Sequence, residues 1–110
     1  IAEACDLQIF HNTLWSQNDQ SLPLESFGAE VSAEIKNNLL PIEITGQLAV
    51  NASNNGTSSE TLFANPSQGD LHLIAGASAI DAGIPLNGAC DQDIDQDSRD
   101  ALPDQGADEF

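Results

Sequence analysis

The sequence has almost no positive charge. Its 110 residues include two basic side chains, Lys36 and Arg99, against 18 Asp and Glu, which gives a formal net charge of −16. Proteins bind nucleic acids through clustered Lys and Arg, so this composition excludes nucleic acid as a partner. An anionic membrane surface is disfavoured for the same reason. A polyanionic polysaccharide would be repelled as well, unless a cation lay between the two.

Long apolar runs are also missing. A membrane-spanning helix needs about 20 consecutive apolar residues, and no stretch of the sequence approaches that length. The overall hydrophobic share is nevertheless 40%, which is ordinary for a folded protein. We therefore expect one folded domain, or part of one, with no membrane span.

Cysteine is limited to Cys5 and Cys90. An even count permits one disulfide, which would close a loop of about 85 residues and add about 4 kcal/mol under the chain-entropy description. The alternative is two separate, small buried residues. There is no CxxC motif or Cys/His cluster of the kind that holds structural zinc.

Apolar and polar residues alternate in residues 7–15 and again in residues 31–40. Alternation with a period of two predicts half-buried β-strands. Each stretch ends in a bend that contains asparagine, and superimposing Asn12 on Asn38 gives a period of 26 residues. Asn suits such bends because it tolerates left-handed backbone angles and bonds to nearby backbone groups. A third strand-like run covers residues 42–50, and residues 51–59 are rich in turn formers, which predicts an exposed loop.

Nothing in the sequence shows a sustained 3.6-residue period with helix caps. The chain is therefore predicted to be mainly β. A repeat of this length is also close to one turn of a solenoid, in which each turn buries its faces against its neighbours.

The last part of the chain contains four phrases in a characteristic order. They are F-x-N-P-x-x-G-D-x-H-L at residues 63–73, S-A-I-D-A-G at 78–83, D-I-D-x-D-x-R at 93–99 and P-D-x-G-A-x-E-F at 103–110. This order and spacing resembles the closing segment of secreted bacterial right-handed parallel β-helix proteins of the carbohydrate-active or surface-anchored type. The resemblance implies an extracellular or cell-surface protein. It divides the chain into partial β-helix coils with loops at residues 1–59 and an irregular C-terminal cap at residues 60–110.

The acidic tail is the best candidate for a metal site. Aspartates alternate along it, and carboxylates at every second position of a loop can converge on one hard cation. Calcium, which takes 6–8 oxygen ligands, is the predicted ion. The alternative is a structural tail in which Asp side chains cap turns and Arg99 pairs with a carboxylate. The predicted calcium ligands are Asp91, Asp93, Asp95, Asp97 and Asp100.

Three functions agree with these features. The first is a non-catalytic C-terminal part of an extracellular β-helix protein that closes the solenoid and binds calcium. The second is the terminal part of a polysaccharide lyase or glycoside hydrolase whose catalytic coils lie upstream, because Lys36 and Arg99 are too few cations for a lyase site here. The third is a structural subunit that assembles with itself. The expected partners are upstream coils or another copy of the chain, together with a polysaccharide.

Overall fold

The computed structural model describes residues 4–16, 22–24, 30–41, 44–46, 49–86 and 88–110. The described chain is rich in short strands, and it contains no α-helix in these ranges. Two short 3-10 turns, η1 (Glu60–Leu62) and η2 (Pro66–Gln68), are its helical elements. In the same part of the chain, no helix is long and apolar enough to cross a membrane. The prediction of a mainly β protein is confirmed.

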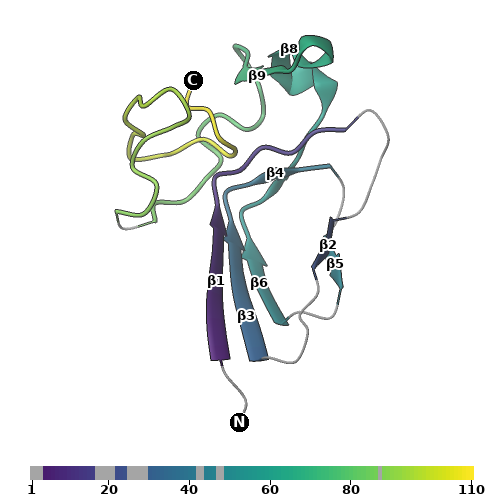
Figure 1. The fold of residues 1–110 in the computed structure, drawn as a ribbon. Helices are drawn as coiled ribbons and strands as arrows, with labels where there is room; N and C mark the ends of the chain where they lie inside the picture. The colour runs from purple at the N-terminus through teal and green to yellow at the C-terminus, as the bar shows by residue number, and fades with distance from the viewer. Residues whose placement is uncertain (1–3, 17–21, 25–29, 42–43, 47–48, 87) are drawn as a thin grey trace.

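The largest sheet has three parallel strands in the order β1 (Ala4–Phe10), β3 (Glu30–Lys36) and β6 (Ala49–Ser53) (Figure 1). Every partner of a β1 residue lies 26 positions later in the chain, as in the pairing of Ile9 with Ile35. The 26-residue period predicted from the two asparagines is therefore confirmed. The next repeat is shorter, because β6 follows β3 with an offset of 17 residues.

Two smaller sheets repeat the same parallel order. β2 (Leu22–Leu24) pairs with β5 (Ile44–Gly46), and β4 (Leu39–Leu40) pairs with β7 (Gly56–Thr57). An isolated parallel bridge joins Thr13 to Leu39, which adds a third neighbour beside β4 and β7. The chain thus makes three successive passes, and each pass lies in register beside the one before it.

The bends after β1, β3 and β6 share one conformation. His11, Asn37 and Asn54 have φ of 53°, 58° and 55°, the left-handed region that Asn adopts more readily than most residues. Residues 51–59 are therefore not the exposed loop that their composition predicts. They end β6, make the third bend and form β7.

The residues that follow these bends form a ladder of asparagines. The Nδ2 group of Asn12 donates to Oδ1 of Asn38 at 3.1 Å, and Nδ2 of Asn38 donates to Oδ1 of Asn55 at 3.0 Å. Asn38 is fully buried. Buried polar side chains are stable only when they are bonded, and here each asparagine bonds its neighbour in the next pass. The ladder therefore fixes the register of the three bends.

Apolar side chains gather in two small clusters. One joins Ala33, Ile35 and Leu40, with Ile9 packed against it. The second lies above the bends, beneath the antiparallel hairpin of β8 (Phe63–Asn65) and β9 (Asp70–Leu73). Its buried members are Leu39, Leu62, Phe63, Leu73, Ala77 and Ala79, and the indole of Trp15 packs against them.

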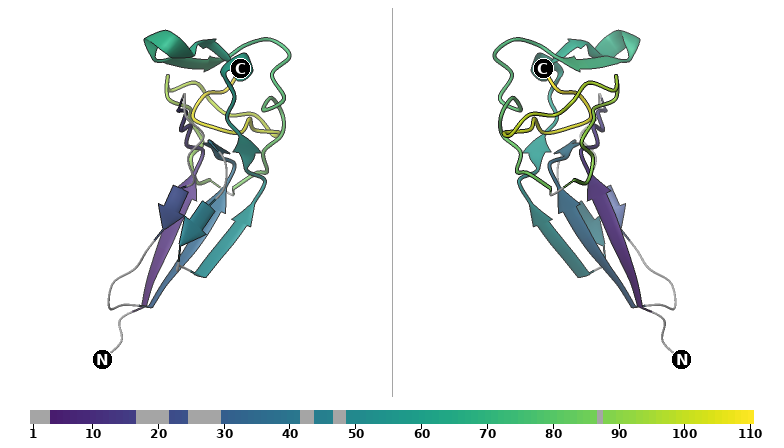
Figure 2. Two further views of the ribbon diagram at one scale, coloured as in Figure 1. Left: turned by 90° about the vertical axis from the view of Figure 1, so that its right-hand side faces the viewer. Right: turned by 90° about the vertical axis from the view of Figure 1, so that its left-hand side faces the viewer.

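Residues 83–110 form an irregular segment, which we call the tail. Figures 1 and 2 show it in light green to yellow beside the ends of the three strands, where they reach their bends. Ala107 donates its backbone N–H to Oγ1 of Thr13, Gly106 to the carbonyl of Asn37, and the Gln105 side chain to the carbonyl of Asn54. These contacts reach all three passes. The tail therefore covers the row of bends along its length.

Candidate functional site

Arg99 lies at the centre of the tail, and its side chain is 5% exposed. One of its terminal nitrogens, Nη1, contacts the carboxylate of Glu109 at 3.2 Å. The other, Nη2, donates to the carbonyl oxygens of Gly106 and Ala107 at 3.1 and 3.0 Å. The expected pairing with a carboxylate is present, but backbone carbonyls take most of the guanidinium donors. A buried guanidinium bonded in this way holds the end of the chain in a fixed shape.

The Asp93 carboxylate binds backbone groups. Its Oδ1 accepts from the N–H groups of Asp95 and Asp97, both at 2.9 Å, and its Oδ2 accepts from Glu109 at 3.0 Å. Burial raises the pKa of this carboxyl, but the three backbone donors and the nearby Arg99 outweigh it, and the pKa is lowered. Asp93 therefore closes a turn within the tail and ties that turn to the C-terminal residues.

Two further buried aspartates do the same work between distant segments. Oδ1 of Asp104 accepts from the backbone of Asp81, and Oδ2 accepts from Phe110, both at 2.7 Å. Asp108 accepts from the backbone N–H of Leu73 in β9 at 2.7 Å. The tail is therefore cross-linked to itself and to the hairpin through carboxylates that accept from backbone amides.

The five predicted calcium ligands lie in different surroundings. The Asp93 carboxylate accepts hydrogen bonds from backbone N–H groups. Asp100 accepts from the N–H of Leu102 at 2.8 Å. Asp91 and Asp97 are exposed. Among the described residues, only Asp95 belongs to a group of three or more side chains with metal-ligand spacing. That group contains none of the other four, and the calcium site stays a prediction.

The group that the structure brings together is His72, Asp95 and Asp108, and we call it the His72 cluster. Their ligand atoms lie within 4.8 Å of one another. β9 positions His72, the turn closed by Asp93 positions Asp95, and the last residues of the chain position Asp108. The three side chains line a pocket of about 240 Å³ together with Thr13 and Ile94.

Both ring nitrogens of His72 face carboxylates. Nδ1 lies 2.5 Å from Oδ1 of Asp70, and Nε2 lies 2.8 Å from Oδ2 of Asp95. Hydrogen bonds that the protonated ring donates to the carboxylates of Asp70 and then Asp95 raise the pKa of His72 to about 9. The same contact lowers the pKa of Asp70. The sequence did not predict His72 as a site residue, because its partners Asp95 and Asp108 are remote in the chain. The Asp70-x-His72 spacing was the one local signal.

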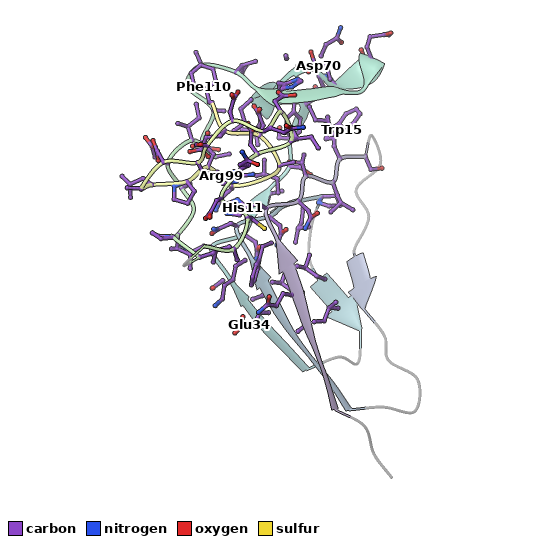
Figure 3. All side chains as sticks on the ribbon, turned by 60° about the vertical axis from the view of Figure 1, so that its left-hand side comes forward. His11, Trp15, Glu34, Asp70, Arg99 and Phe110 are labelled. Carbon is purple, nitrogen blue, oxygen red and sulfur yellow. The ribbon has the colours of Figure 1, made fainter. Side chains whose placement is uncertain are left out.

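A second pocket, of about 220 Å³, lies beside His11, Cys90 and Arg99. Figure 3 labels His11 and Arg99 next to the tail. His11 is buried, and the Nδ2 group of Asn37 lies 3.1 Å from its Nε2. The Asn37 amide is itself oriented by the backbone of Ile84, which it bonds through both its nitrogen and its oxygen. Asn37 is therefore the donor to His11, and Nε2 of His11 is an unprotonated acceptor.

Cys90 is exposed, and its thiol is free. The structure thus does not show the predicted bridge to Cys5, whose side chain lies outside the described residues. The backbone of Cys5 precedes His11 by six strand positions, which correspond to roughly 20 Å, whereas Cys90 lines the His11 pocket. The disulfide stays a prediction, and it would need a Cα separation below about 7 Å.

No protein-family model, curated protein or solved structure matches the chain. Its function is therefore inferred from the arrangement of the residues described above.

Proposed function

We propose that this chain is the closing, non-catalytic part of an extracellular right-handed parallel β-helix protein. The observation that carries the proposal is the register: three passes of the chain pair in parallel, with an asparagine ladder through their bends. Successive passes that pair in parallel with their neighbours, here at offsets of 26 and 17 residues, are expected of a coiled β solenoid. The extracellular setting and a polysaccharide partner rest on the resemblance of the tail motifs.

The tail has the contacts that a closing element needs. It bonds the bends of all three passes, and its buried acids accept hydrogen bonds from backbone amides. Carboxylates used in this way fix loops that carry few apolar side chains, because Asp93 accepts from three backbone donors and Asp104 from two. In this proposal the tail keeps the bends in register.

The outer edge of β1 supports an upstream coil as the partner. β1 and β6 are the two outer strands of the three-stranded sheet, and no described strand pairs with the free edge of β1. An unpaired strand edge presents a row of free N–H and C=O groups that favour pairing with another strand. In the proposed parent protein, an upstream coil covers this edge.

Hydrogen exchange tests this proposal. In the chain alone, we expect the β1 amides that point away from β3 to exchange much faster than the amides of β3. Adding the upstream residues encoded by the same gene should protect these amides and raise the melting temperature. Slow exchange along all of β1 in a chain that sedimentation shows to be monomeric would contradict the proposal. Protection that grows with chain concentration would instead favour another copy as the partner at this edge.

The contact between the tail and the bends can be tested at Gly106. A methyl group there would lie 2.5 Å from Oγ1 of Thr13 and 2.9 Å from Cδ1 of Leu39. Gly76 has a similar left-handed φ, +83° against +96°, but nothing lies within 4 Å of an added methyl group. Both alanine substitutions cost about 1 kcal/mol in backbone strain, and overpacking adds about 2 kcal/mol at Gly106 alone.

Urea denaturation of Gly106→Ala and Gly76→Ala should therefore give clearly different midpoints, with the Gly106 variant the less stable. Equal losses in the two variants would mean that the tail does not press against the bends in solution.

A further inference from the structure

We propose that His72, Asp95 and Asp108 bind a transition-metal dication of the zinc type, with Asp70 orienting the imidazole. This site differs from the predicted calcium loop in its ligands and in its ion. It is independent of the proposed closing function, since the ligands come together in the isolated chain.

The first argument is the placement of acceptors around one imidazole. A neutral imidazole has one N–H and one lone pair. If Nδ1–H donates to Asp70, the lone pair of Nε2 points at Oδ2 of Asp95, only 2.8 Å away. Two acceptors at this distance need a cation between them, either a proton or a metal ion. Asp108 supplies a further carboxylate to the same point, which favours an ion that takes more than two ligands.

The distances agree with a small metal ion. Ligand atoms about 2 Å from a tetrahedral zinc ion lie about 3.3 Å from each other. The ligand atoms of the His72 cluster lie within 4.8 Å of one another, and Nε2 of His72 lies 2.8 Å from Oδ2 of Asp95. Shifts of about 1 Å or less in most of these atoms would satisfy zinc geometry. The side chains of His72 and Asp95 are 51% and 53% exposed, so both have room to move.

The surroundings resemble those of a metal ligand set. A metal-binding histidine commonly donates its other ring N–H to a carboxylate that orients the ring, and Asp70 is placed to accept this bond. Asp108 is buried, and its Oδ2 is fixed by the N–H of Leu73, while Oδ1 accepts no hydrogen bond from the described residues. The pocket of about 240 Å³ gives an ion access and leaves room for a water molecule as a fourth ligand.

The ligand types select the class of ion. Imidazole nitrogen with two carboxylates suits zinc and its neighbours in the first transition row. Calcium prefers six to eight oxygen ligands, and a site with one nitrogen and two carboxylates supplies too few. Magnesium likewise prefers oxygen ligands and keeps most of its water. We therefore expect zinc to bind here in preference to both.

Isothermal titration of the whole chain with Zn²⁺ tests the site. We expect one zinc ion per chain, with no displacement by millimolar Ca²⁺ or Mg²⁺. Asp70→Asn should weaken binding by about 10- to 100-fold, because it removes only the orienting bond. His72→Gln and Asp95→Asn should weaken it further. The melting temperature of each variant confirms that it folds, which we expect because these side chains lie at the surface.

Two matched controls separate this site from others that zinc could occupy. Asp97→Asn removes an exposed acid of the same loop, and Cys90→Ser removes the exposed thiol. Both variants should bind zinc as the parent does. If His72→Gln binds zinc as tightly as Asp97→Asn, the ion sits elsewhere on the acidic surface and the proposal fails. Absence of zinc binding to the parent chain would mean that a proton alone occupies the space between His72 and Asp95, which also overturns it.

Discussion

Replacing Asn38 by alanine is expected to cause one of the two largest losses of stability in this protein. The side chain is fully buried at the middle of the asparagine ladder. Its Oδ1 accepts from the backbone N–H of Asn12 at 2.7 Å, and its Nδ2 donates to the carbonyls of Ile9 and Lys36 at 2.9 and 3.0 Å. Alanine removes the side-chain partner of the Asn12 N–H and of the Ile9 carbonyl, whereas the Lys36 carbonyl still accepts from the N–H of His11. Two such buried groups, at about 2 kcal/mol each, amount to about 4 kcal/mol, a large part of the 5–15 kcal/mol typical of a domain.

Urea denaturation followed by circular dichroism measures this loss, and Asn65→Ala is the matched control. Asn65 is exposed, and its side chain accepts only from the hydroxyl of Ser67. Its replacement should change the free energy of unfolding by about 0.5 kcal/mol or less. Similar values for the two variants would show that the ladder does not hold the passes together.

Acid should destabilise the protein through His11, and the loss should begin at a pH above that at which ordinary carboxylates titrate. Burial, followed by the positive charge of Arg99, lowers the pKa of His11 from 6.5 to about 4, although the carbonyls of Gly106 and Asp104 and the Asp104 charge oppose the shift. The bond from Asn37 also requires an unprotonated Nε2. Between pH 6.5 and about 4, the imidazole of His11 is protonated in the unfolded chain but stays neutral in the folded protein. Stability is therefore complete above pH 6.5 and is lost as the pH falls towards 4, by on the order of 3 kcal/mol in all.

The variant His11→Asn isolates this effect. Asparagine already occupies the equivalent left-handed positions at 37 and 54, and its amide oxygen can accept from Asn37. Between pH 4 and 6.5, the free energy of unfolding of this variant should fall less steeply than that of the parent. The other histidine provides the control. The pKa of His72 is raised to about 9, so any stability from its ion pairs is complete below 6.5 and is lost as the pH rises through 9.

His72→Gln should therefore keep the slope of the parent protein in the acid range. A His11→Asn profile parallel to that of the parent would show that His11 is not held neutral in the folded protein.

The features that the sequence predicted correctly are those that leave a pattern within a short stretch of residues. The strand alternation and the Asn12–Asn38 repeat were visible because a pleated strand alternates every second residue and because asparagine accepts the left-handed bend. The third rung, Asn55, was missed because the repeat shortens from 26 to 17 residues and places it in a segment that has the composition of a loop. Turn-forming residues have the same composition in an exposed loop and in a tight bend between paired strands.

In the acidic tail, a clear sequence pattern did not decide what the carboxylates bind. The alternation of aspartates suggested that several carboxylates converge on calcium, with Asp-capped turns as the alternative. The structure directs the Asp93 carboxylate to three backbone amides, and it brings Asp95 to His72 across 23 residues. A carboxylate in a loop can bind an ion or an amide equally well, and which of the two lies nearby depends on how the tail folds back on the bends.

By itself, the sequence determined the β-rich class, the 26-residue spacing of the first two passes and the strongly acidic net charge. The first two follow from short-range periodicity. The net charge is a sum over the charged side chains and does not depend on where the fold places them. Only the tertiary structure decided that the tail covers all three bends, that His11 takes the place of an asparagine and that His72 meets Asp108. Those contacts join residues 26 to 94 positions apart, and neither charge nor periodicity records which distant groups will meet.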